Sequence, residues 1–155
     1  MSELFIRPYQ ADDAEAVWQL HNHALEGTGA HVGNGAWDAD VRDPGKSYLE
    51  KGGQFLVALI EGAVAGMGAY LPVSEDSVEI KRMRVMPNAQ GSGIGKQVLI
   101  ALEQDAVKNG FNTAVLETTI QQVPAQKLYE NHGYQSTHQS KMGRFEILHY
   151  RKSLC

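Results

Sequence analysis

A run of three closely spaced glycines constrains this chain more than any other feature. It reads Pro87-Asn88-Ala89-Gln90-Gly91-Ser92-Gly93-Ile94-Gly95-Lys96-Gln97 and joins a strand-like segment to a helical one. Glycine is costly to order, so this spacing indicates a backbone that side chains would obstruct. The first N–H groups of a helix lack partners within the helix, and the helix dipole makes that end electropositive. The run therefore predicts an anion cradle, to which Lys96 adds a positive charge.

Two well-known phosphate loops do not fit this run. The dinucleotide-binding fingerprint needs glycine at its first, third and sixth positions, and counting from Gly91 the sixth is Lys96. The P-loop needs Gly-Lys followed by Ser or Thr, whereas Gln97 follows here and Gln90 occupies the earlier glycine position. A flexible connector is the alternative interpretation, and the position at the start of a helix argues against it.

The remaining sequence divides into short strands and helices without an internal repeat or a domain linker. Apolar patterns and turn residues predict strands at Leu4–Pro8, Phe55–Ile60, Val64–Leu71, Val78–Val85, Thr113–Thr119, Tyr134–His138 and Phe145–Arg151. Helical spacing predicts helices at Asp12–Leu20, within Pro44–Lys51, at Ile94–Asn109 and at Pro124–His132. Early antiparallel strands and late strand–helix–strand crossovers indicate a single α/β (α+β) domain over residues 1–155, with a mixed, mostly antiparallel sheet of about seven strands flanked by about four helices.

Composition limits the partners of such a domain. The formal net charge is -4 and the pI about 5.8, which disfavours nucleic acid and anionic membranes as partners. The only cysteine is the terminal Cys155, so neither an intramolecular disulfide nor a CxxC metal site can form. The six histidines lack metal-ligand spacing. No secretory signal or membrane span is apparent, and a cytoplasmic protein is expected.

Beyond the cradle, several short motifs share their order and spacing with one enzyme superfamily. The segment Gln90–Gly95 resembles motif A, Q/R-x-x-G-x-G/A, of the GNAT superfamily of acetyl-CoA-dependent N-acetyltransferases, and Val85 and Pro87 match its V-x-P lead-in. The segment Ala125–Tyr134 is similar to the family's A-x-x-L-Y-x-x-x-G-F/Y pattern. The likeness covers nearly the whole chain, and it implies the GNAT fold, acetyl-CoA as co-substrate and no metal.

The resemblance also implies where acetyl-CoA binds. Its pyrophosphate would be held by backbone N–H groups from Gly91 to Lys96. Its pantetheine would pair with the fourth strand where the fourth and fifth strands splay apart, along the main chain of Met83, Arg84 and Val85. Gln122 stands where the family often has asparagine. It keeps the amide group on a side chain that is one methylene longer. The implied cofactor-binding residues are Met83, Arg84, Val85, Gln90, Gly91, Ser92, Gly93, Ile94, Gly95, Lys96, Gln122, Ala125 and Tyr129.

Acetyl transfer to an amine requires a base, an oxyanion donor and an acid. A lysine-like amine, with a pKa of about 10.4, must lose a proton before it attacks. Tyr129 matches the family's acid, because a phenol can protonate the departing sulfur. A core tyrosine with a bonded hydroxyl is the alternative interpretation. The resemblance places the oxyanion donor on the main chain of the fourth strand, near Met83 or Val85.

Glu79 is the candidate base, acting directly or through a water. Strict alternation along the fourth strand would place Glu79, Lys81, Met83 and Val85 on one face, and Ile80, Arg82 and Arg84 on the other. Charges on both faces of a strand are costly unless one face lines a cleft. A structural carboxylate paired with Lys81 or Arg82 is the alternative, and Glu117 is a second candidate base.

These residues predict direct transfer of acetyl from acetyl-CoA to a primary amine of a small molecule or peptide. The terminal position of Cys155 argues against a covalent acetyl-enzyme. A non-catalytic acyl-CoA sensor is the rival interpretation, and a nucleotide-phosphate enzyme ranks last. Variable loops expected at Gly27–Trp37, Leu71–Ser77 and Gln139–Phe145 would select the acceptor, with Trp37 and His31 as possible contacts. A homodimer is a family-level expectation.

Overall fold

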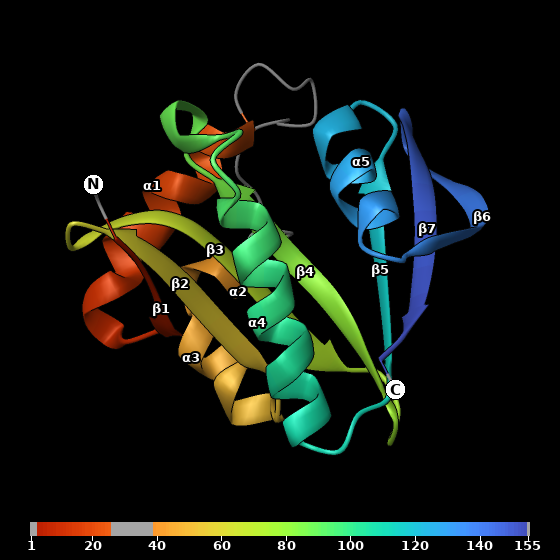
Figure 1. The fold of residues 1–155 in the computed structure, drawn as a ribbon, viewed down its shortest axis with the longest axis horizontal. Helices are drawn as coiled ribbons and strands as arrows, with labels where there is room; N and C mark the ends of the chain where they lie inside the picture. The colour runs from red at the N-terminus through yellow and green to blue at the C-terminus, as the bar shows by residue number, and fades with distance from the viewer. Residues whose placement is uncertain (1–2, 26–38, 155) are drawn as a thin grey trace.

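The computed structural model describes residues 3–25 and 39–154, which form one sheet with helices on both faces (Figure 1). The predicted loop at 27–37, with His31 and Trp37, lies outside the described residues. The strands are β1 (Leu4–Pro8), β2 (Gln54–Ile60), β3 (Ala63–Pro72), β4 (Ser77–Val85), β5 (Thr113–Thr119), β6 (Gln135–Met142) and β7 (Phe145–Ser153). The helices are α1 (Ala14–Leu25), α2 (Ala39–Arg42), α3 (Pro44–Ser47), α4 (Ile94–Lys108) and α5 (Val123–Asn131).

The seven strands of the described chain lie in the order β1-β2-β3-β4-β5-β7-β6. Only β4 and β5 pair in parallel, and every other neighbouring pair is antiparallel. The predicted fold class is thus confirmed, and the element boundaries shift by a few residues. The short helix α2 was not predicted, because four residues carry too little periodicity to reveal a helix.

Two apolar clusters lie on opposite faces of the sheet. The helix α4 covers one face with the stripe that its sequence predicted, formed by Val98, Leu99, Leu102 and Ala106. On the other face, Val17 and Leu20 of α1 pack with Tyr48 and the strands β2 and β3. Figure 1 shows α4 in front of the sheet, with its first turn at the same end of the sheet as α5. The packing of α4 therefore fixes where the glycine loop, which precedes this helix, is held.

Close packing of α4 on β3 depends on Gly68. A Cβ atom at this residue would lie 2.5 Å from Met83 Sδ, 2.7 Å from Val98 Cγ1 and 2.9 Å from Leu102 Cδ1. Atoms of that kind do not approach so closely, so β3 can be this near to α4 only without a side chain here.

A β-bulge at Arg82 interrupts the alternation of β4. The pairing with β3 shifts between Met67 and Ala69, and Arg82 has a φ of 59°, which is unusual for a residue other than glycine. The alternation expected from the sequence is therefore wrong from Arg82 onward. Val78, Ile80, Met83 and Val85 all pack on the α4 side. The opposite face of β4 carries Glu79, Lys81, Arg82 and Arg84.

The parallel pairing of β4 with β5 ends early. It runs from Ser77 opposite Thr113 to Ile80 opposite Leu116, although β4 continues to Val85 and β5 to Thr119. The antiparallel pairing of β4 with β3 continues to Val85. Beyond Ile80 the two strands therefore leave a split in the sheet, and in Figure 1 they diverge toward the start of α4.

We expect Gly68→Ala to lower the free energy of unfolding by about 1–3 kcal/mol, because its methyl group would overpack the contact between β3 and α4. Urea unfolding measures the change. Gly45→Ala is the control, because a Cβ there would meet only Asp43 Oδ1 at 3.8 Å and the residue lies in α3. Equal stability of the two variants would show that β3 and α4 are not in such close contact.

Candidate active site

The glycine loop adopts a backbone that other residues rarely adopt. Gly91 and Gly93 have φ values of 84° and 88°, and a Cβ atom at either would meet nothing within 4 Å. Glycine is thus required by conformation here, and the space above the loop is open. Gly95 differs, because a Cβ there would lie 3.4 Å from Leu128 Cδ2 of α5. The loop is therefore close to α5 at the top of the split.

The backbone N–H groups of this loop are available to a ligand. The first bond of α4 runs from the Gln97 N–H to the Gly93 carbonyl, 3.1 Å away, and the Gly93 N-cap carries no capping side chain. From Gln90 to Lys96, no N–H donates to a described residue outside regular helix or strand pairing. The two polar side chains of the loop bond to carbonyls, namely Gln90 Nε2 to Val85 O at 3.2 Å and Ser92 Oγ to Ala89 O. The predicted anion cradle is consequently not capped by its own side chains.

The edge of β4 that faces the split presents the main chain of Met83 and Val85. The Met86 N–H donates to Ala65 of β3, and backbone groups alternate direction along a strand. Met83 and Val85 therefore direct their N–H and C=O groups away from β3, toward the split. Arg84, which lies opposite Met67, directs its own main chain to β3. Its side chain instead reaches the split, where Nη1 donates to the Met83 carbonyl at 2.9 Å.

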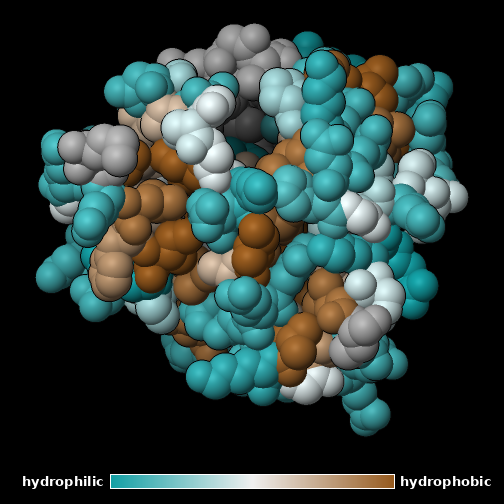
Figure 2. Space-filling view, in the orientation of Figure 1, coloured by the Kyte–Doolittle hydropathy of each residue, from teal (hydrophilic) through white to brown (hydrophobic). Residues whose placement is uncertain are grey.

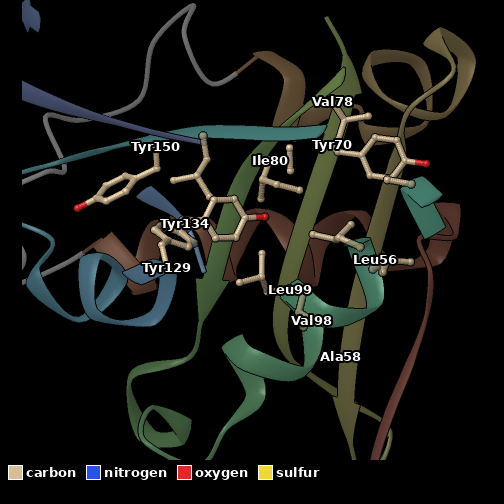
Figure 3. Packing of buried hydrophobic residues seen from close by; sticks show 14 of the residues in the cluster. Leu56, Ala58, Tyr70, Val78, Ile80, Val98, Leu99, Tyr129, Tyr134 and Tyr150 are labelled. Atoms are coloured by element: carbon tan, nitrogen blue, oxygen red, sulfur yellow. The ribbon is translucent and has the colours of Figure 1, made fainter. Parts of the chain in front are cut away.

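Tyr129 lies on α5 in a cluster of three tyrosines. Its ring centroid is 5.8 Å from that of Tyr134 and 6.3 Å from that of Tyr150, and only 5% of the residue is exposed. Figure 3 shows Tyr129, Tyr134 and Tyr150 at one end of the buried cluster that also contains Ile80 and Leu99. Figure 2 shows that the surface is hollowed between the start of α4 and α5.

The Tyr129 hydroxyl differs from those of the other buried tyrosines. Four such tyrosines donate to a carboxylate, in the pairs Tyr48–Asp40, Tyr70–Asp105, Tyr134–Glu103 and Tyr150–Glu130. Tyr129 donates to none of the residues described in the structure. Burial raises its pKa to about 12, while the charge of Arg84 acts in the opposite direction. Tyr129 is therefore a protonated phenol at neutral pH, and its proton is not committed to a structural partner.

Glu79 lies on the face of β4 that is opposite α4. Burial raises the pKa of this half-buried carboxyl group; Lys81 lowers it, the charge of Glu117 raises it further and His149 lowers it. Glu117 Oε2 is 3.5 Å from His149 Nδ1, so the second candidate base is engaged with a histidine and is about half exposed. Glu79 has no ion pair with Lys81 or Arg82 among the described contacts. The role of Glu79 as a base stays a prediction.

Two other predicted cofactor contacts lie near the end of β5. Gln122 accepts a hydrogen bond through Oε1 from Thr118 Oγ1 at 2.7 Å. Ala125 is half-buried in α5 and packs against the α4-side cluster. Both residues lie on the same side of the split as Tyr129. The predicted residues thus line its two edges, with Met83, Val85 and the glycine loop on one and α5 on the other.

The sequence did not predict an ion pair beside the bulge. Arg82 donates from Nε and Nη2 to the two carboxylate oxygens of Asp40, at 2.9 and 2.7 Å. The Tyr48 hydroxyl bonds to the same carboxylate. These bonds hold the pKa of Asp40 below its usual range despite burial, which acts to raise it. A pair that is 42 residues apart in the sequence leaves no local signal.

A split strand pair, a helix start with uncapped amides and an uncommitted buried phenol together define a domain suited to an extended anionic ligand. Comparison with known families agrees. The model of the acetyltransferase (GNAT) family matches residues 14–134. The chain therefore belongs to the acetyltransferase (GNAT) family, which is a family of acyltransferase enzymes.

Several individual proteins are similar to this chain in sequence or in fold. N-acetylaspartate synthetase of Xenopus tropicalis is 37% identical over 97 residues, which cover 61% of this chain and 36% of that protein. The chain thus spans about a third of the length of that relative. An acetyltransferase of the GNAT family from Staphylococcus aureus superposes with a TM-score of 0.89 at 18% identity, covering 99% of this chain and 100% of its own. A proposed acetyltransferase of Salmonella typhimurium, solved with its cofactor acetyl-CoA, superposes with a TM-score of 0.82 at 24% identity over 98% and 94% of the two chains.

Helices long and apolar enough to cross a membrane are absent from residues 3–25 and 39–154. The same residues contain no group of three or more histidine, cysteine or acidic side chains that could hold a metal ion.

We expect Glu79→Gln to increase the free energy of unfolding at pH 7. Because burial raises the pKa of Glu79 in the folded protein, the folded state binds a proton more tightly than the unfolded chain does. The wild type therefore loses stability as pH rises from the ordinary glutamate pKa through the raised one, and a neutral amide avoids this loss. The gain should vanish at a pH below the ordinary glutamate pKa.

Urea unfolding of both proteins across this pH range measures the effect. Glu146→Gln is the control, because it removes a carboxylate from an exposed position on β7. If Glu79→Gln were the less stable protein at pH 7, the carboxylate would have a structural partner that favours its charge.

Proposed function

We propose that this domain transfers the acetyl group of acetyl-CoA directly to a primary amine. The observation that carries the proposal is the early end of the β4–β5 pairing beside the uncapped amides of the glycine loop. This arrangement offers a cradle for a diphosphate and an unpaired strand edge for an amide-containing chain, and acetyl-CoA contains both groups. The Salmonella typhimurium neighbour that was solved with acetyl-CoA supports the same ligand.

The proposal assigns the cofactor contacts to both edges of the split. The N–H groups from Gly91 to Lys96 would hold the diphosphate at the electropositive start of α4. The main chain of Met83 and Val85 would pair with the pantetheine, and an N–H of this edge would donate to the thioester oxygen as negative charge develops there. Gln122 and Ala125 would contact the pantetheine from the opposite edge. No metal is required for any of these contacts.

Glu79 and Tyr129 would move the protons. Glu79 takes the proton that the amine loses, and a raised pKa makes a carboxylate a stronger base near neutral pH. The amine nitrogen attacks the thioester carbon, and the C–N bond forms as the C–S bond breaks. Tyr129 donates its hydroxyl proton to the departing sulfur, and the phenol is restored from solvent.

The acceptor class is a primary amine. The Xenopus tropicalis relative is named for N-acetylaspartate, a product acetylated on nitrogen, and this supports an amine acceptor here. The rival function is a non-catalytic acyl-CoA sensor, which would use the same cradle without a functional acid. The hydroxyl of Tyr129 favours the enzyme, because a hydroxyl without a partner among the described residues can donate its proton to a reacting group.

We expect Tyr129→Phe to lower kcat on the order of a hundred-fold or more, because general-acid catalysis contributes about that much. Its dissociation constant for acetyl-CoA should change little. Thiol release with a panel of primary amines measures kcat, and calorimetry measures binding. Tyr150→Phe is the control from the same cluster, since its hydroxyl is bonded to Glu130 at 2.8 Å and its loss should affect stability rather than kcat. Tight acetyl-CoA binding by the wild type without thiol release from any amine would favour the sensor.

We expect Gly91→Ala to weaken acetyl-CoA binding about ten-fold or more, which corresponds to roughly 1.4 kcal/mol. Its methyl group would occupy the open space above the cradle and would strain a backbone with a φ of 84°. Gly62→Ala is a matched control, because Gly62 has a φ of 82° and equally open surroundings in the turn between β2 and β3. Both variants should lose about 1–2 kcal/mol of stability. Calorimetric titration with acetyl-CoA distinguishes them, and equal affinities would mean that the diphosphate binds elsewhere.

A further inference from the structure

Arg84 is a partly buried cation without an anionic partner among the described residues. Its one hydrogen bond there runs from Nη1 to the Met83 carbonyl at 2.9 Å. Its Nε is buried and makes no hydrogen bond. Burying a charge without a partner is unfavourable, and a guanidinium has five N–H donors to satisfy. The fold therefore keeps an unsatisfied positive charge at the edge of the split.

The neighbouring carboxylate is already engaged. Asp40 receives two hydrogen bonds from Arg82 and one from Tyr48, so its oxygens are committed. Burial lowers the pKa of Arg84 to about 10, and the positive charge of Arg82 contributes to the same shift. An anion that entered this region would act against both effects and raise the pKa of Arg84. Nothing in the described chain supplies such an anion.

The position of Arg84 indicates which molecule could bring an anion to it. Its side chain lies on the face of β4 opposite α4, and it interacts electrostatically with Tyr129 across the split. Glu79 lies on the same face of β4. The hydroxyl of Thr119, at the end of β5, is also buried without a hydrogen bond. A polar molecule reacting between Glu79 and Tyr129 would thus lie beside two unsatisfied polar groups.

We propose that Arg84 binds a carboxylate of the acceptor, so that the substrate class is a primary amine that also carries a carboxylate. The proposal rests on the proposed function. A guanidinium forms paired hydrogen bonds with a carboxylate, and this geometry would orient the amine as well as attract it. Arg84 is therefore a specificity-determining residue of the acceptor site.

The diphosphate of acetyl-CoA is the other anion in the reaction, and the geometry does not favour it for Arg84. The diphosphate cradle lies at the start of α4, on the face where Met83 and Val85 pack. Arg84 lies on the opposite face, with Arg82, Tyr48 and Asp40. The two possible anions predict different effects of an Arg84 substitution. Loss of a contact with acetyl-CoA would affect every acceptor equally, whereas loss of a contact with the acceptor's carboxylate would affect only acceptors that carry one.

The test compares amino acids with their carboxamides as acceptors, at saturating acetyl-CoA. The two members of each pair have the same amine and the same side chain. They differ only in that one carries a carboxylate and the other a neutral amide. We expect the wild type to use the amino acid of at least one pair with a kcat/KM ten- to a hundred-fold above that of its amide, the range for a charge-assisted hydrogen bond. Arg84→Gln should lower the kcat/KM of the amino acid far more than that of its amide and so remove most of this preference, and Arg84→Lys should retain part of it.

Arg151→Gln is the control, because it removes the same charge from an exposed position on β7 and should keep the preference. Calorimetry gives a readout independent of turnover: the CoA complex of the wild type, but not of Arg84→Gln, should bind the N-acetylated amino acid more tightly than its amide. Three results would overturn the inference: equal use of both members of every pair, equal losses for both in Arg84→Gln, or weaker acetyl-CoA binding in that variant. Absence of thiol release with every amine would instead refute the proposed function, and the inference with it.

Discussion

The structure depends on the point where β4 stops pairing with β5. The two strands share only the register from Ser77 to Ile80, and β4 then remains paired with β3 alone. A strand edge exposes N–H and C=O groups that need partners. In this chain the exposed edge lies directly before the glycine loop, and α5 lies across the split from it. The ligand would therefore complete the sheet, and the loop would hold the charged end of the same ligand.

The bulge at Arg82 determines which side chains meet at that split. Without it, Arg84 would follow Ile80 onto the α4 face, and a charged side chain would enter an apolar cluster. The extra residue moves Met83 and Val85 into that cluster and places Arg84 with Glu79 on the opposite face. The strain of a positive φ at Arg82 is offset by its two hydrogen bonds to Asp40. The ion pair and the bulge thus act together to place polar side chains at the split.

Features with local signals could be predicted from the sequence, and features made by distant contacts could not. The stripe of α4, the strand at Thr113–Thr119 and the open glycine loop follow from periodicity and glycine spacing, and the structure has all three. Tyr129 was singled out by its motif alone. The bulge was missed because an arginine with a φ of 59° has no sequence signature. Its partner Asp40 lies in a four-residue helix that periodicity cannot reveal.

Tyr129 and Arg84 lack a carboxylate partner among the described residues, and both lie at the split between β4 and β5. Most buried tyrosines bond to a carboxylate, and Arg82 is fully paired, so the fold can satisfy such groups elsewhere. Tyr129 and Arg84 lack such partners, and Glu79 stays charged only against the effect of burial. Each of these costs stability, and all three lie around the split between β4 and β5. Acetyl-CoA and an amine that carries a carboxylate would together give all three side chains a partner, and these interactions would favour the bound reactants over water.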